Sequence, residues 1–219
     1  MTDTQTPPLV DTSDMVRFHR IFREALSAAP KLVSSVQAGD TARAALVGDY
    51  YTNVLRLLHA HHTGEDELLT PKLLDRCPDQ AEVIARVADQ HHNVDGALGN
   101  AAAALAAWRT EPELRTATAL TDALQSLGTA LVRHLDDEEA YVLPIAARAI
   151  TEAEWNQLPA NGLRHFDGDK LWLVLGLIRQ QMTAHELEQM DASMPPPLAE
   201  AWSHGGRDMF EDFVSALQG

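Results

Sequence analysis

Two stretches of this 219-residue chain repeat one arrangement of histidine, glutamate and proline. Residues 61–71 read HHTGEDELLTP, and residues 134–144 read HLDDEEAYVLP. Each has a histidine, a glutamate four positions later and a proline further on: His61, Glu65 and Pro71, then His134, Glu138 and Pro144. On an α-helix, residues four apart lie on one face, about one turn from each other. Each pair can therefore direct an imidazole and a carboxylate at one point, and two such helices facing each other can surround a pair of metal ions.

Two further histidines, His19 and His91, lie on apolar helical faces outside these repeats. Their helical neighbours are Met15, Val16, Phe22 and Leu26 for His19, and Ile84, Val87, Val94 and Leu98 for His91. Both imidazoles are predicted to point inward, and a hydrogen-bonded core histidine is the alternative at each position. The predicted metal site takes at least one side chain from each of four helices: His19, His61, Glu65, His91, His134 and Glu138.

The first repeat leaves a second register open. His62 and Asp66 have the same spacing as His61 and Glu65, and leucines lie near them as well. The match to the second repeat favours His61 and Glu65, so His62 is expected at the surface. Asp66 and Glu139 are each expected either in solvent or hydrogen-bonded to a site histidine, a common role for carboxylates near metals. The remaining histidines are also expected at the surface: His59, His92, His165, His185 and His204. For His59, His62 and His92 the alternative is a hydrogen bond to a ligand of the site.

The residue types in the predicted site indicate which metals it would hold. A glutamate can bridge two cations through its two oxygens, and terminal imidazoles with an oxo or hydroxo bridge complete near-octahedral coordination. Imidazole and carboxylate ligands together favour iron, with manganese as the other possibility. The thiolates that structural zinc prefers are missing, because the chain has a single cysteine, Cys77. Six polar side chains would otherwise be costly to bury in a core.

The elements that must position these residues read as long helices. Helices are predicted over residues 14–37, 41–75, 79–108 and 113–150, and Pro30 is expected to interrupt the first. Short connections between them predict an all-α, up-down-up-down four-helix bundle over residues 12–150. The second and fourth helices then run in the same direction and place the two repeats at similar depths.

Residues 1–11 are expected to form a disordered tail, and residues 151–219 a helical extension packed on the bundle. In the extension a short turn is predicted at 151–155, a loop at 159–168 and a helix at 169–188. A rigid break at 195–197 precedes a last helix over 198–217, interrupted at Gly205 and Gly206.

Charge and composition exclude several classes of partner. The formal net charge is −15 and 45% of the residues are hydrophobic. An acidic chain argues against nucleic acid and anionic membranes as partners, because both attract a basic face. No apolar run is long enough to span a bilayer. The single Cys77 excludes an internal disulfide and is typical of a reducing cytosol.

The stretches HHTGEDELLTP, DQHHNVD and HLDDEEAYVLP, with the preceding His19, together resemble the hemerythrin-like (HHE cation-binding) domain over residues 12–150. The resemblance implies a non-haem di-iron four-helix bundle that binds O2 or reacts with oxygen species. Two departures are typical of the bacterial proteins of this type rather than of oxygen carriers. Val87 and Asp95 stand where carriers have a further histidine in helix three, and the fourth helix has His-xxx-Glu instead of His-xxxx-Asp.

The first of these departures predicts an open coordination position, or one filled by water or Asp95. The sequence therefore favours a protein that binds O2, peroxide or NO as a sensor, scavenger or store. The alternatives are a di-iron oxidoreductase, either catalase-like, peroxidase-like or an oxygenase, and a non-redox metal store.

Overall fold

The computed structural model describes residues 10–166 and 170–219, and these residues form helices and turns without a strand. The four predicted long helices are present, each divided into shorter elements. The first consists of α1 (Ser13–Ser27) and α2 (Ala29–Ser34), and the second of α3 (Thr41–Gly64), η1 (Glu65–Leu69) and α4 (Thr70–Arg76). The third consists of η2 (Pro78–Gln80), α5 (Ala81–Ala88) and α6 (Gln90–Thr110), and the fourth of α7 (Leu114–Asp137), η3 (Glu138–Val142) and α8 (Leu143–Ala149).

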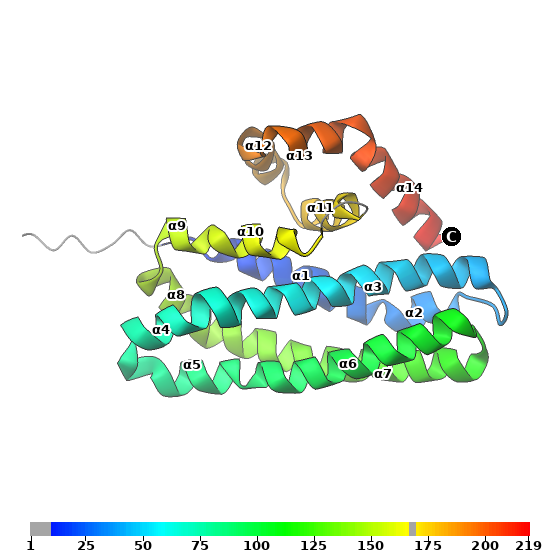
Figure 1. The fold of residues 1–219 in the computed structure, drawn as a ribbon, viewed down its shortest axis with the longest axis horizontal. Coiled ribbons are helices and arrows are strands. Elements are labelled where there is room, and N and C mark those ends of the chain that lie inside the picture. The colour runs from blue at the N-terminus through cyan, green and yellow to red at the C-terminus, as the bar shows by residue number, and fades with distance from the viewer. Residues whose placement is uncertain (1–9, 167–169) are drawn as a thin grey trace, which may run out of the picture.

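These four helices form the predicted bundle (Figure 1). Helix α3 packs against α6 and α1, and α7 packs against α6, α1 and α2. The helices that carry the two repeats therefore lie diagonally across the bundle and run in the same direction. The expected interruption near Pro30 is confirmed, because α1 ends at Ser27 and α2 begins at Ala29. A proline inside a helix lacks the N–H that the ladder requires.

The core of the bundle is apolar along most of its length. In α7 the leucines recur at helical spacing, and Leu120, Leu124, Leu127 and Leu131 are all buried. The Tyr51 hydroxyl donates a hydrogen bond to the Ala25 carbonyl oxygen at 3.0 Å, so this large buried ring leaves no unpaired polar group. The polar residues of the core are concentrated at the level of the two repeats.

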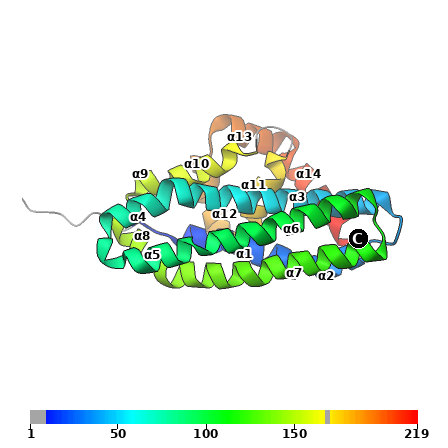
Figure 2. The ribbon, with the colours of Figure 1, turned by 60° about the horizontal axis from the view of Figure 1, so that its bottom comes forward.

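The extension lies along one side of the bundle (Figures 1 and 2). Its elements are α9 (Glu152–Trp155), α10 (Gln157–Arg164), α11 (Leu171–Gln180), α12 (Ala184–Ser193), α13 (Pro196–Ala201), η4 (Trp202–Gly206) and α14 (Arg207–Gln218). Helix α10 packs on α3, and α11 packs on α1, α3 and α14. Gly176 in α11 permits this last contact, because the Phe210 ring fills the space that a Cβ would need.

Two expectations for the extension are wrong. The stretch predicted as a loop from residue 159 is helical to Arg164, because Pro159 falls in the first turn of α10, where its missing N–H has no helical partner. The single helix predicted over 169–188 is two helices. Thr183 caps a new helix and forms a capping box with Glu186, whose carboxylate accepts from the Thr183 N–H at 2.7 Å.

The other expectations concern the two ends of the chain. The predicted interruption at Gly205 is confirmed, and Gly205 has a φ of 132°, a conformation that favours glycine. Most of the predicted tail lies outside the described residues. Val10, which is described, is buried and donates its N–H to the Ala147 carbonyl oxygen at 3.2 Å. Among the described residues, no helix combines the length and hydropathy needed to cross a membrane.

Candidate metal centre

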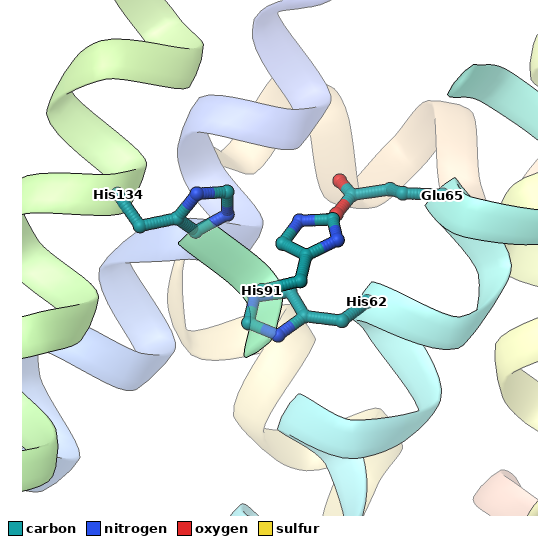
Figure 3. A group of neighbouring side chains, drawn as sticks. All are labelled: His62, Glu65, His91 and His134. Carbon is teal, nitrogen blue, oxygen red and sulfur yellow. The ribbon is translucent and has the colours of Figure 1, made fainter. Parts of the chain in front are cut away.

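The structure brings the six side chains predicted from the sequence into one buried cluster, with His62 as a seventh. They form two groups that could each hold a metal ion: His62, Glu65, His91 and His134, and His19, His61, Glu65 and Glu138. Within each group, one potential ligand atom per residue lies within 4.8 Å of all the others. Figure 3 shows the first group, in which His62 and Glu65 come from the continuous helix of α3 and η1, and meet His91 of α6 and His134 of α7. Glu65 belongs to both groups, so it lies between two potential metal positions.

The two oxygens of Glu65 face different groups. Oε1 lies 3.5 Å from His61 Nε2, and Oε2 lies 3.6 Å from His91 Nε2. These distances exceed those of ordinary hydrogen bonds. They match two ligands of one ion, because atoms each about 2.1 Å from a metal lie roughly 3–3.6 Å apart at angles of about 90–120°. Glu65 would therefore be able to contact an ion in each group.

Glu138 occupies the equivalent place in the second repeat. Its Oε2 lies 3.5 Å from His19 Nε2 and 3.6 Å from His134 Nε2. His19 belongs to one group and His134 to the other. Both repeats thus place their glutamate between the two groups, as expected for helices that lie diagonally across the bundle.

Many polar atoms of this cluster are buried without a hydrogen-bond partner. They are Nε2 of His19, His61 and His134, Nδ1 of His134, both ring nitrogens of His62, both carboxylate oxygens of Glu65 and Oε2 of Glu138. A buried polar group left unsatisfied costs about 1–3 kcal/mol. So many in one place are inconsistent with a purely structural core. Metal ions would satisfy one nitrogen of each ring and the carboxylate oxygens, so the residues fit the group that their chemistry implies.

Two carboxylates outside the cluster fix the orientation of its histidines. His19 Nδ1 lies 2.8 Å from Glu139 Oε1, and His91 Nδ1 lies 2.7 Å from Asp66 Oδ1. When Nδ1–H donates to a carboxylate, the lone pair of Nε2 is left facing the cluster. Of the two alternatives predicted for Asp66 and Glu139, hydrogen bonding to a site histidine is therefore confirmed.

The prolines of the repeats follow a shared distortion of the helix. Glu65 and Glu138 each begin a π-helical turn, in which Thr70 N–H donates to the Glu65 carbonyl and Leu143 N–H to the Glu138 carbonyl. Pro71 and Pro144 come directly after these donors. A proline provides no N–H for the regular ladder and its ring clashes with the carbonyl four residues earlier, so the wider turn is accommodated here. The repeated motif thus specifies a local backbone geometry as well as two ligands.

The electrostatics of the cluster favour neutral imidazoles. Burial lowers the pKa of His61 and of His62 well below 6.5. Burial, with the neighbouring His91, lowers the pKa of His134 to about 3. Burial and the nearby Glu138 raise the pKa of Glu65 well above 4.5. Neutral imidazole is the form that binds metals, so these histidines are available as ligands without first losing a proton.

The expectation that His62 lies at the surface is wrong. Its side chain is only 1% exposed, and its ring stacks on that of His91 with centroids 4.4 Å apart. Because α3 packs against both α1 and α6, adjacent residues about 100° apart around its axis can both face neighbours. His61 therefore points toward His19, and His62 toward His91. The two registers predicted for the first repeat are therefore not exclusive alternatives, since His61 and His62 both enter the cluster.

His62 adds a fifth imidazole to the cluster, from α3 and not from the third helix. The position left by the missing helix-three histidine, open or filled by water or Asp95, stays a prediction. The HH doublet near the end of a helix with neighbours on two sides was the signal that could have revealed the fifth imidazole. The other histidines lie outside the cluster: His59, His92, His185 and His204 are exposed, and His165 is half-buried.

Two cavities adjoin the cluster. A small one of about 20 Å³ is lined by Glu65, His91, His134 and Glu138 together with apolar residues of α5 and η3. A larger one of about 250 Å³ borders His61 and Glu65 from the side of the extension. The cluster is therefore reached by a space of about one water molecule on one side and by a larger chamber on the other.

The family comparison agrees with this geometry. The family model described as the hemerythrin HHE cation-binding domain matches residues 10–146, which span the bundle and all seven cluster residues. Neither the curated proteins nor the solved structures compared with the chain give a significant match. The helical bundle, the buried histidine and glutamate cluster and the matched family model lead to one conclusion: the chain belongs to the hemerythrin HHE cation-binding domain family.

Proposed function

We propose that the cluster holds two iron ions and binds O2, or a related small oxidant such as peroxide or NO, as a sensor, scavenger or store. One ion would be held by His62, Glu65, His91 and His134, and the other by His19, His61, Glu65 and Glu138. The observation that carries the proposal is the position of Glu65, whose two oxygens face the two groups. A single ion would need only one of these groups.

The donor set supports iron over the other common metals. Five imidazoles and two carboxylates provide nitrogen and oxygen ligands, which suit iron and, less well, manganese. The described residues around the cluster contribute no cysteine, and Cys77, at the end of α4, is absent from both groups. A pair of iron ions would supply two electrons to a bound oxidant.

The small cavity supports a small oxidant as the ligand. Its volume of about 20 Å³ suits one water-sized molecule, and its apolar wall includes Ile84, Val87 and Val142. Val87 occupies the place where oxygen carriers of this family have their further histidine. The apolar wall would favour an uncharged diatomic molecule over an anion, and His91 and His134 also line the cavity.

A second candidate is a di-iron oxidoreductase that acts on an organic molecule. The observation that favours it is the cavity of about 250 Å³ beside His61 and Glu65, which is far larger than O2 or peroxide requires. A metal store without redox activity would need neither cavity.

The proposal is tested by the visible absorption spectrum of iron-loaded, anaerobically reduced protein as air is admitted. A band that appears and then disappears when oxygen is removed supports reversible binding. A band that decays irreversibly favours the oxidoreductase, which is then assayed with peroxide and with organic substrates. The absence of any band at two bound irons per chain contradicts both.

A further inference from the structure

The larger cavity lies between the bundle and the extension. Phe18 and Leu57 line it from α1 and α3, and Leu163, Ile178 and Met190 line it from α10, α11 and α12. Together with α9 and α13, these helices of the extension form one side of the chamber. The matched family domain ends at residue 146, so this wall is built by residues beyond it. The cavity is therefore a feature that the extension adds to the bundle.

The size of the cavity sets the size of the ligand. A cavity of about 150 Å³ in a protein core binds benzene, which has six heavy atoms. By proportion, the volume of about 250 Å³ corresponds to a ligand of about ten heavy atoms. Such a molecule is much larger than O2, peroxide or NO.

Apart from the cluster residues His61 and Glu65, each charged or amide side chain in the wall has at least one partner. Asp14 accepts a hydrogen bond from Trp155 Nε1 at 3.1 Å, and Arg17 pairs with Glu186 at 2.8 Å. The Gln181 amide donates to Glu24 Oε2 at 2.8 Å. A charged ligand would lose its hydration here and gain no free counter-charge in return. These contacts therefore favour a neutral molecule over a carboxylate or an amine.

The cavity also reaches the cluster. His61 and Glu65 belong to its lining, and His61 Nε2 and Glu65 Oε1 are buried without hydrogen-bond partners. A molecule in the chamber would therefore lie against the group formed by His19, His61, Glu65 and Glu138. The small cavity borders His91 and His134, which do not line the chamber, and the two spaces share Glu65.

We propose that the chamber between the bundle and the extension is a binding site for a neutral, predominantly apolar organic molecule of about ten heavy atoms. This site is a second ligand site beside the one for the small oxidant. The evidence for this site is the cavity and not the metal, so the site can be tested independently of the proposed function.

A homologous series of straight-chain primary alcohols tests the site in the full-length protein, with and without iron. Isothermal titration calorimetry from 1-pentanol to 1-dodecanol should give affinities that rise about fourfold per added methylene. The rise should stop near 1-nonanol, which has ten heavy atoms. Affinity that is undetectable throughout, or that rises without a limit up to 1-dodecanol, would overturn the proposal. Nonanoate binding more tightly than 1-nonanol would overturn the neutral class.

Matched variants locate the binding. Leu163→Trp and Ile178→Trp each place an indole in the chamber and should weaken 1-nonanol binding at least tenfold. Leu114→Trp is the control, because Leu114 is 79% exposed and does not line the cavity. Met190→Ala enlarges the chamber, so the chain length at which affinity stops rising should increase. This variant keeps the test available even if a tryptophan variant fails to fold. Unchanged binding in both the tryptophan and the alanine variants would place the alcohol elsewhere and refute the assignment.

Iron content measured on the same samples separates this proposal from the proposed function. Alcohol binding with the predicted limit in protein that takes up no iron when iron is supplied supports the chamber while contradicting the metal centre. Two irons per chain without alcohol binding supports the metal centre and contradicts the chamber as a binding site.

Discussion

Glu139 orients the His19 ring: its Oε1 accepts a hydrogen bond from Nδ1–H of the imidazole at 2.8 Å, while Nε2 of the same ring faces Glu138. Asp66 holds His91 in the same way from the first repeat. Each repeat therefore carries two consecutive carboxylates with different tasks. The first points into the cluster, and the second orients a histidine on a neighbouring helix.

The outer carboxylates should tune metal affinity without abolishing it. Glu139→Gln and Asp66→Asn are each expected to weaken iron binding about 10–100-fold, because the ring keeps its place but loses the partner that fixes its orientation. Competition with a chelator measures the change. Asp136→Asn is the matched control, since Asp136 shares Arg23 with Glu139 but contacts no histidine of the cluster. Equal losses for Asp136→Asn and Glu139→Gln would contradict the orienting role.

The inner carboxylates should matter far more. Glu65→Ala and Glu138→Ala are each expected to reduce the iron content from two ions per chain to less than one, because each glutamate lies between the two groups. Elemental analysis of the purified variants gives the number. Circular dichroism confirms that they remain helical. If either variant retains two irons, its bridging role is wrong.

His62 provides the sharpest test among the histidines. His62→Ala should remove at least one iron per chain, because its ring nitrogens are buried without partners and stand in the group with His91 and His134. His59→Ala is the matched control, one turn earlier in α3 and exposed. His204→Ala in the extension should also leave the iron content unchanged. Full iron occupancy in His62→Ala would show that His62 is not a ligand and only packs against its neighbours.

The metal-free protein should lose stability as the pH falls below about 6.5. The native pKa of His61, His62 and His134 is lowered, so the unfolded chain binds protons before the native state does. Each imidazole then lowers the free energy of unfolding by up to about 1.4 kcal/mol per pH unit. For His134 this window extends down to a pH of about 3. Glu65 acts in the opposite direction because its native pKa is raised, but one carboxyl does not offset three imidazoles.

Urea denaturation of the chelator-treated protein at pH 7.5, 6.5 and 5.5 measures this dependence. His134→Gln should show a shallower decline, because it removes one of the groups whose pKa is lowered. A free energy of unfolding that does not change across this range would contradict the assignment of neutral, buried imidazoles in the native state.

Much of the fold and the cluster could be predicted because both rest on local patterns. Helical spacing identified the four long helices, and the repeat of His61 and Glu65 in His134 and Glu138 indicated two facing ligand pairs. Turn residues such as Pro30 and Gly205 marked interruptions that the structure contains. These signals lie within single helices and need no knowledge of how the helices pack.

The features that were missed depend on packing. His62 enters the cluster because α3 has neighbours on two sides, which the spacing along one helix does not reveal. The π-helical turns at Glu65 and Glu138 gave no signal beyond the two prolines. The large cavity arises where α10, α11 and α12 meet α1 and α3, and no single segment of the sequence encodes it.

The central claim is a pair of metal ions that share Glu65, and a crystal structure of the iron-loaded protein tests it most directly. An anomalous difference map at the iron edge should contain two peaks in the cluster. One should lie among His62, Glu65, His91 and His134, and the other among His19, His61, Glu65 and Glu138. A single peak, or a pair of peaks with no contact to Glu65, would contradict the account.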